Sequence, residues 1–420
     1  MDVKIYPSKI SGRVKVPSSK SVVHRALIAS SLSNKESIIS NVDFNEDIYA
    51  TIAALKVLGA KITTSDNTIE VIGLNLNNKL DVVEIDANES GSTLRFIIPL
   101  ASYLANKVII SGSERLMERP LNIYQDLYID EGLIFKDGAK KEIIGSLSGG
   151  HYQIDGSVSS QFLSGLMFLL PIIVQDSKIE VLPPFESKPY VDLTIETLKK
   201  YNINITSKGD TYFIKGGQSY LPYNLSAEGD YSQAAFFAVL GAINNEVVIE
   251  NLNLDSVQGD RAILAMLLSL NVKIEELDKA VKVYKSNISS KTIDLANTPD
   301  LGPILCVLGL FSEAYIKLIN VKRLRIKESD RLLAIKSQLE KIGAKVILEE
   351  NSITIFKLDK FLDKEIVVSG ENDHRIVMAM AIAATSLKAP LIINGADAIN
   401  KSYPNFFNDL SNLGVKVEYL

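Results

Sequence analysis

Hydrophobic and polar positions along the chain recur with a period of about 70 residues. In six segments an apolar stretch with helical spacing ends at glycine or asparagine, and in most of them apolar and polar residues then alternate. The aligned glycines and asparagines are Gly59, Gly132, Asn202, Asn271, Gly343 and Gly414, separated by 73, 70, 69, 72 and 71 residues. Because these residue types tolerate the left-handed conformation that ends a helix, the pattern predicts six helices, most of them followed by a strand.

A second series of helices, apolar on nearly all sides, runs in phase with the first. These helices are predicted to begin near Lys20, Ser90, Ser159, Asp230, Asp300 and Asn372. A helix without a polar face belongs in a core rather than on a surface. Each repeat therefore contains one buried helix, one amphipathic helix and short strands. This predicts an α/β fold of two domains with three repeats in each.

The buried helices begin with more polar residues than a helix cap requires. One Ser, Asp or Asn is enough for a cap, whereas these segments read SSKS, ESGST, SSQ, GDYSQ, PDLG and NDHR. The helix dipole makes a lysine or arginine unfavourable at a helix N-terminus. An anion held there by free N–H groups and by these cations offsets that cost. We therefore expect the helix heads to bind a small molecule with several negative charges.

Cations recur at equivalent positions of the repeats, both on the buried helices and at the starts of the amphipathic helices. The principal ones are Lys20, Arg25, Arg95, Arg119, Lys327, Arg331, Arg375 and Lys401. An isolated lysine or arginine is usually solvated surface, but this recurrence favours a binding role. These eight cations are enough to bind two anions that each carry several negative charges.

Two carboxylates, Asp300 and Glu328, fall among these cations. Asp300 is either a functional acid or simply the N-cap of a buried helix. Glu328 is either a functional acid or simply a salt-bridge partner of Lys327 or Arg331. The pattern alone does not decide between these roles. Among the three histidines, His374 is interpreted as functional, His24 as structural and His151 as a loop residue.

Composition narrows the class of protein. The 420 residues carry a formal net charge of −5, which argues against a general nucleic-acid surface. The apolar stretches are shorter than the roughly 20 residues that span a bilayer, and the N-terminus does not read as a signal peptide. We therefore expect a cytoplasmic protein without a membrane partner. The single cysteine, Cys306, lies within PILCVLGLF and predicts a buried, inert thiol, and a zinc site is not expected.

Nine short motifs follow one another along the chain. They are PSSKSVVHR (17–25), ESGSTLR (89–95), ERP (118–120), SSQ (159–161), SKPY (187–190), PD (299–300), KESDR (327–331), NDHR (372–375) and KSYPNFF (401–407). Together they resemble the motifs of the EPSP synthase family of enolpyruvyl transferases. The resemblance implies an inside-out α/β fold with a discontinuous first domain, residues 1–18 and 228–420. It implies a second domain, residues 19–227, and an active site in the cleft between the two.

The resemblance also implies a reaction. The enolpyruvyl group of phosphoenolpyruvate is transferred to the 5-hydroxyl of shikimate 3-phosphate, and phosphate is released, in aromatic amino-acid biosynthesis. The implied enzyme is a cytoplasmic monomer that needs no metal or organic cofactor.

The resemblance assigns roles to individual residues. Matches to contacts with shikimate 3-phosphate are Lys20, Ser21, Arg25, Ser159, Ser160, Gln161 and Ser187. Matches to the phosphoenolpyruvate pocket are Gly91, Arg119, Arg331, Arg375 and Lys401, with Lys20 and Gln161 close to both substrates. Asp300 and Lys327 match groups at the shikimate ring, and Glu328 matches a proton-transfer residue. The implied catalytic residues are Asp300, Glu328 and Lys20.

Two positions depart from the family pattern, and two alternatives stay open. Glu89 stands where many members carry Asn, and Arg323 replaces an expected Asn, so sensitivity to the inhibitor glyphosate is undecided. One alternative is the sister family that uses UDP-N-acetylglucosamine as acceptor. That family typically has a reactive cysteine on an exposed loop, unlike Cys306. The other is a non-catalytic scaffold that binds anionic partners, which explains the period but not the carboxylates among the cations.

Overall fold

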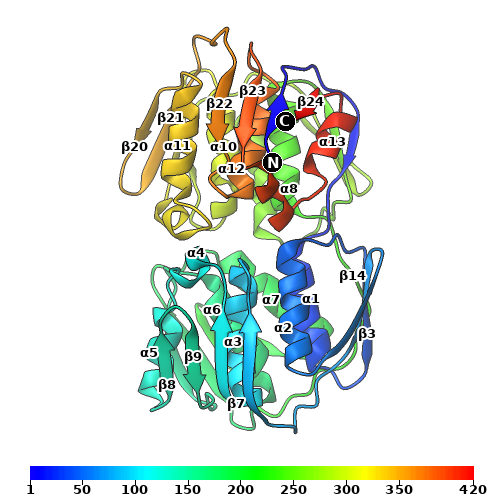
Figure 1. Cartoon of the computed structure of the whole chain (residues 1–420), viewed down its shortest axis with the longest axis vertical. Coiled ribbons are helices and arrows are strands. Elements are labelled where there is room, and N and C mark those ends of the chain that lie inside the picture. Colours follow the sequence, from blue (N-terminus) through cyan, green and yellow to red (C-terminus); the bar gives the residue numbers. More distant parts are fainter. The chain divides into compact units, whose positions relative to one another are not determined.

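The computed structural model describes residues 1–420 and divides the chain into two compact units (Figure 1). Unit 1 comprises Met1–Pro17 and Glu228–Leu420, and unit 2 comprises Ser18–Ala227. Each unit buries its own hydrophobic core. No helix combines the length and the apolar character that a membrane crossing requires.

Each unit contains three four-stranded sheets, and all six sheets share one order of strands. In each sheet two parallel strands are followed by two antiparallel ones. In unit 2 the sheets are β14 (Leu225–Ser226)–β3 (Glu36–Ser40)–β5 (Thr68–Ile72)–β4 (Lys61–Ser65), β6 (Leu80–Asp86)–β7 (Ala105–Ser111)–β9 (Lys141–Ile144)–β8 (Ile134–Asp137) and β10 (His151–Asp155)–β11 (Ser177–Leu182)–β13 (Thr211–Ile214)–β12 (Ile205–Lys208). In unit 1 they are β2 (Arg13–Lys15)–β15 (Val247–Glu250)–β17 (Ala280–Val283)–β16 (Ile274–Leu277), β18 (Lys291–Asp294)–β19 (Tyr315–Ile319)–β21 (Ser352–Phe356)–β20 (Val346–Leu348) and β22 (Ile366–Ser369)–β23 (Leu391–Asn394)–β1 (Val3–Ile5)–β24 (Val417–Tyr419). The predicted α/β fold of six repeats is confirmed.

The helices predicted to be apolar on all sides lie inside the units. They are α1 (Lys20–Leu32), α3 (Gly91–Leu104) and α6 (Ser160–Leu169) in unit 2, and α8 (Tyr231–Ile243), α10 (Gly302–Gly309) and α12 (His374–Ala384) in unit 1. Every residue of α8, α10 and α12 is buried. Sheets and amphipathic helices surround these buried helices, which is the inside-out arrangement.

The amphipathic helices end where the period predicts. They are α2 (Glu46–Val57), α5 (Asn122–Asp130), α7 (Lys188–Lys200), α9 (Ala262–Ser269), α11 (Arg331–Lys341) and α13 (Phe406–Asn412), and the remaining helix, α4 (Glu114–Met117), is one short turn. The six aligned glycines and asparagines all have positive φ, from 66° at Asn202 to 105° at Gly59. After each of them, an N–H reaches back to a carbonyl five residues earlier, as from Ala60 to Leu55 at 3.0 Å. This bond defines the Schellman motif, so the predicted caps are confirmed.

The chain passes from one unit to the other between the first strand and the first helix of a repeat. β2 precedes α1 in the sequence but pairs with β15 in unit 1, and β14 precedes α8 but pairs with β3 in unit 2. In the third sheet of unit 1, β1 lies between β23 and β24. Both ends of the chain are therefore needed to complete unit 1.

Candidate active site

In unit 1, the guanidinium group of Arg331 is held by three carboxylates. Arg331 is the first residue of α11, which Asp330 caps by accepting two backbone N–H bonds. Its Nε lies 2.7 Å from Asp373, its Nη1 lies 2.9 Å from Asp300, and its Nη2 lies 3.6 Å from Glu328. Burial alone would lower the pKa of Arg331, but the three carboxylates raise it well above its usual value. This arginine is a permanent charge that orients three acids.

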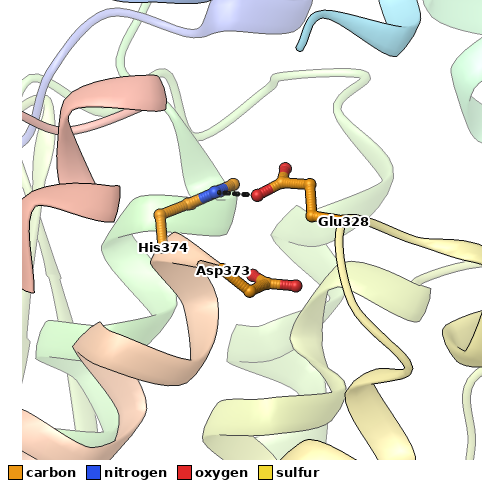
Figure 2. Close-up of side chains that lie close together, drawn as sticks. All are labelled: Glu328, Asp373 and His374. Atoms are coloured by element: carbon orange, nitrogen blue, oxygen red, sulfur yellow. Dashed lines mark hydrogen bonds and ion pairs between the residues drawn. The ribbon is translucent and has the colours of Figure 1, made fainter. Parts of the chain in front are cut away.

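Glu328 also contacts His374, the first residue of the buried helix α12 (Figure 2). The Nδ1 of His374 lies 2.8 Å from Oε2 of Glu328. Asp373 caps the same helix by accepting from the N–H of Arg375 at 3.0 Å. Sequence analysis interpreted His374 as functional, and the structure places it directly on a candidate proton-transfer residue.

The donor atoms of Glu328, Asp373 and His374 lie within 4.8 Å of one another, which raises the question of a metal. Both carboxylate oxygens of Asp373 already accept hydrogen bonds from Arg331. A divalent cation there would lie beside a guanidinium group. The donor set therefore fits a network of ion pairs better than a metal site.

Asp300 lies in a short 3-10 turn, Pro299–Leu301, immediately before α10. Its carboxylate lies 2.9 Å from Arg331, 3.1 Å from Arg375 and 3.5 Å from Lys327. The side chain is 23% exposed, so it remains accessible to a ligand. Leu301, not Asp300, occupies the cap position of α10, so the N-cap interpretation of Asp300 is wrong.

The other two cations of unit 1 lie on neighbouring polar groups. Arg375 donates to the hydroxyl of Ser232 at 3.1 Å. Lys401 ends the 3-10 turn Ala396–Lys401 and donates to the carbonyl of Asn372 at 2.6 Å. The structure therefore brings five predicted residues of unit 1 together at the N-terminal ends of α10, α11 and α12. The five are Asp300, Lys327, Glu328, Arg331 and Arg375. Lys401 contacts the residue Asn372, just before α12.

In unit 2, Lys20 is the first residue of α1 and forms an ion pair with Asp47. The two charged atoms are 2.7 Å apart, and Asp47 lies in the first turn of α2. Both side chains are mostly but not fully buried. A carboxylate thus holds the cation at the head of α1.

Two buried arginines of unit 2 have no carboxylate partner. Arg25 donates to the hydroxyl of Thr194 at 2.7 Å and to two backbone carbonyls, and Arg95 donates to the Oε1 of Gln161 at 2.9 Å. Burial lowers the pKa of Arg25 to about 10. Burial and the charge of Arg119 lower the pKa of Arg95 to about 9. A buried cation without a counter-charge is costly, so these residues favour binding of an anion nearby.

Gly91 is the first residue of α3 and packs against the guanidinium group of Arg119. A Cβ atom at Gly91 would lie 2.8 Å from Nη1 of Arg119, so a larger residue there would displace this guanidinium group. Ser90 caps this helix by accepting from the N–H of Thr93. Two predicted phosphoenolpyruvate residues are therefore in contact.

The remaining predicted residues of unit 2 lie at the heads of α6 and α7. Ser159 caps α6, which places Ser160 and Gln161 in its first turn. The amide nitrogen of Gln161 donates to Ser92 on α3 at 3.0 Å. Ser187 precedes α7 and has a φ of 57°, in the left-handed region.

Sequence analysis missed Asp47 and Asp373, the acids that hold Lys20 and Arg331. Asp373 lies within the NDHR motif, in which His374 and Arg375 were the predicted functional residues, and Asp47 lies at a helix start that matches no motif. Both act on partners distant in sequence, which local patterns do not reveal. His151 was expected in a loop but begins β10, where it pairs with Glu180 at 3.0 Å. Cys306 is buried as predicted.

Comparison with known proteins gives consistent matches over the whole chain. A family model described as EPSP synthase (3-phosphoshikimate 1-carboxyvinyltransferase) matches residues 5–410. A Clostridium kluyveri protein named 3-phosphoshikimate 1-carboxyvinyltransferase is 43% identical over 420 residues, which cover 99% of this chain and 98% of that protein. A Clostridium beijerinckii protein with the same name is 40% identical over 426 residues, covering 98% and 97%.

Solved structures share the fold. The EPSP synthase of Acinetobacter baumannii matches with a TM-score of 0.82 and 20% identity, over 100% of both chains. The enolpyruvyl transferase NikO of Streptomyces tendae matches with a TM-score of 0.76 and 14% identity, over 100% of this chain and 98% of that one.

Proposed function

The chain belongs to the EPSP synthase (3-phosphoshikimate 1-carboxyvinyltransferase) family, and on that premise we propose which residues carry out its reaction. It transfers the enolpyruvyl group of phosphoenolpyruvate to the 5-hydroxyl of shikimate 3-phosphate and releases phosphate, in aromatic amino-acid biosynthesis. Both units supply residues to the same pair of substrates in this proposal.

Unit 2 binds the phosphate of shikimate 3-phosphate through cations and small polar side chains. The assigned residues are Lys20, Ser21, Arg25, Ser159, Ser160, Gln161 and Ser187. The carboxylate-free environment of Arg25 supports this role, because a dianion supplies the missing counter-charge. Gly91 and Arg119 bind phosphoenolpyruvate together with Arg331, Arg375 and Lys401.

Unit 1 supplies the acid–base groups. The acceptor hydroxyl loses its proton as its oxygen attacks C2 of phosphoenolpyruvate, while C3 gains a proton. The tetrahedral adduct then expels phosphate as the proton on C3 is withdrawn. One group must therefore act at oxygen, and another must give and take a proton at carbon.

Asp300 acts on the hydroxyl, with Lys327 beside it at the shikimate ring, and Glu328 acts at C3. Lys20 neutralises charge at the bridging oxygen. The observation that carries this assignment is that one guanidinium, Arg331, orients both carboxylates, at 2.9 Å from Asp300 and 3.6 Å from Glu328. Charges that are fixed in place before the reaction are usually the largest single contribution to transition-state stabilisation.

Phosphate release from purified protein tests the proposal. We expect release only when phosphoenolpyruvate and shikimate 3-phosphate are both present, and we expect it to persist in EDTA, because the cations of both units neutralise the substrates. UDP-N-acetylglucosamine in place of shikimate 3-phosphate tests the sister activity. Activity with that acceptor, or activity that a chelator abolishes and a divalent ion restores, contradicts the proposal.

Cys306 does not support transfer to UDP-N-acetylglucosamine, the activity of the sister family, which typically has a reactive cysteine on an exposed loop. The thiol of Cys306 is buried within α10, and burial raises its pKa well above the usual value, so no thiolate is available at neutral pH.

A further inference from the structure

A line of hydrogen-bonded side chains crosses the core of unit 2, behind the residues assigned to the substrates. Nδ1 of His24 lies 2.7 Å from Oγ1 of Thr51, which lies 2.6 Å from Oγ1 of Thr93. Thr93 in turn donates to the Oγ of Ser90 at 2.7 Å. These residues come from α1, α2, α3 and the cap of α3, and none is more than 1% exposed.

Thr93 donates its hydroxyl hydrogen to Ser90, so its oxygen is free to accept from Thr51. The hydroxyl of Thr51 also lies 3.4 Å from the carbonyl oxygen of Asp47, one turn earlier in α2. The oxygen of Thr51 accepts from the ring of His24 when the ring proton is on Nδ1. Burial and the two neighbouring cations of α1 hold the pKa of His24 well below its usual value, so the ring is neutral. Its Nε2 has no hydrogen-bond partner, as expected when the one ring N–H is on Nδ1.

The line lies one helical turn behind the proposed substrate contacts. Lys20 and Asp47 precede its first two members by four residues each, and Gly91 begins the helix that carries the third. Residues four apart lie on the same face of a helix. The ion pair of Lys20 and Asp47 is thus an outer connection between α1 and α2, and the hydroxyl line is an inner connection that also reaches α3.

Packing alone does not require hydroxyl groups here. Valine has nearly the shape of threonine, and the surrounding core is apolar. Hydrogen bonds in such a core constrain distance and direction more narrowly than apolar contacts do. The line therefore fixes the separation of three helix heads.

We propose that His24, Thr51 and Thr93 are positioning residues that set the distance between Lys20 and Gly91, and thereby the fit of phosphoenolpyruvate. They touch no substrate and act through the heads of their helices. The inference rests on the proposed function, which assigns Lys20 and Gly91 to phosphoenolpyruvate.

Removal of single hydroxyl groups tests this. In Thr51→Val and Thr93→Val we expect the kcat/KM for phosphoenolpyruvate to fall at least about tenfold, mostly through KM. The KM for shikimate 3-phosphate should change less than about threefold, since four of its seven proposed contacts lie at the heads of α6 and α7, which the line does not reach. Thr51→Ser and Thr93→Ser keep the hydroxyl and should restore most of the loss.

Ser102→Ala is the matched control. Ser102 lies near the other end of α3, is equally buried, and shares a hydrogen bond of 2.5 Å with Tyr128. It should lower the thermal midpoint as the valine variants do, but leave both KM values unchanged. Amide hydrogen exchange gives a readout that needs no activity. The first turns of α1 and α3 should exchange at least about tenfold faster in Thr93→Val but not in Ser102→Ala.

These experiments distinguish failure of the positioning proposal from failure of the proposed function. Unchanged exchange at the helix heads together with unchanged KM overturns the proposal, and so does faster exchange with an unchanged KM for phosphoenolpyruvate. A starting protein that releases no phosphate from its two substrates refutes the proposed function instead, while exchange still tests the positioning line. If one valine variant fails to fold, the other decides.

Discussion

Arg331 shows how single residues in this protein acquire their roles from distant partners. Its three carboxylates come from a turn before α10, a loop before α11 and the cap of α12. Glu328 has in addition a histidine on its other oxygen. Glu328 thus lies between a guanidinium and an imidazole, and from there we propose that it exchanges a proton with C3 of the substrate.

Glu328→Gln tests that role. The amide keeps the shape but neither gives nor takes a proton at C3, so we expect kcat to fall by at least about 100-fold. Solvent deuterium exchange into the C3 methylene should fall with it, while shikimate 3-phosphate affinity stays within about threefold. Glu340→Gln is the control, because Glu340 lies on α11 but pairs only with Lys336 on the surface. Near-normal deuterium exchange in Glu328→Gln would place the proton donor elsewhere.

His24 predicts a pH dependence of stability. Its pKa is depressed in the folded protein, against 6.5 for an unperturbed ring, so unfolding takes up a proton below about pH 6.5. Its share of the stability is complete above that pH and decreases as the pH falls, by up to about 1.4 kcal/mol per pH unit. Urea unfolding between pH 7 and pH 5 should therefore show a shallower loss in His24→Asn. An unchanged slope in His24→Asn contradicts the prediction.

At the scale of elements, the helix ends are the most local feature of the fold. Gly59 has a φ of +105°, and a Cβ there would meet nothing within 4 Å. Substitution by alanine thus adds backbone strain without a clash. The expected loss of stability in Gly59→Ala therefore comes from the backbone conformation alone.

Gly59→Ala should lower the free energy of unfolding by about 1–2 kcal/mol, and Gly59→Asn by less. Denaturant titration measures both. Gly150→Ala is the control, because Gly150 is equally open but has an ordinary φ, and it should change stability by less than about 0.5 kcal/mol. Equal effects of the two alanine substitutions would show that the left-handed cap is not what these positions require.

The contrast between caps and sheets shows what the sequence can predict. A left-handed helix end favours Gly or Asn at one position, so the residue types alone predict the six caps. The pairing of β2 with β15, and of β14 with β3, depends on partners distant in sequence, and nothing in the short strands specifies them. The site shows the same division. The cations of the site are predicted by the sequences of the helix heads. Asp47 and Asp373 are not, because only the fold brings them next to Lys20 and Arg331.

At the scale of the whole molecule, the two units differ in how the chain builds them. All three sheets and the core of unit 2 come from the single segment Ser18–Ala227. Unit 1 takes β1 and β2 from one end of the chain and the rest from the other. The ends meet, because Leu420 donates to the carbonyl of Asp2 at 3.0 Å and β1 pairs with β24 (Figure 1).

We expect the fragment 18–227 to fold alone and the fragment 228–420 not to. The second fragment lacks β1, the strand between β23 and β24, and β2, the parallel partner of β15. Joining 228–420 through a short linker to 1–17 should restore folding. Circular dichroism and amide-proton dispersion measure this, and cooperative unfolding of 228–420 without the joined strands would contradict it.

The placement of β1 also has a consequence for synthesis on the ribosome. β1 emerges before every other strand, yet both of its partners, β23 and β24, are made after residue 390. Unit 2 is translated in between as one uninterrupted stretch and can fold while unit 1 is still being made. For most of translation the nascent chain therefore carries a short strand, two of whose three residues are apolar, with no sheet to join. The first strand to leave the ribosome is among the last to be paired.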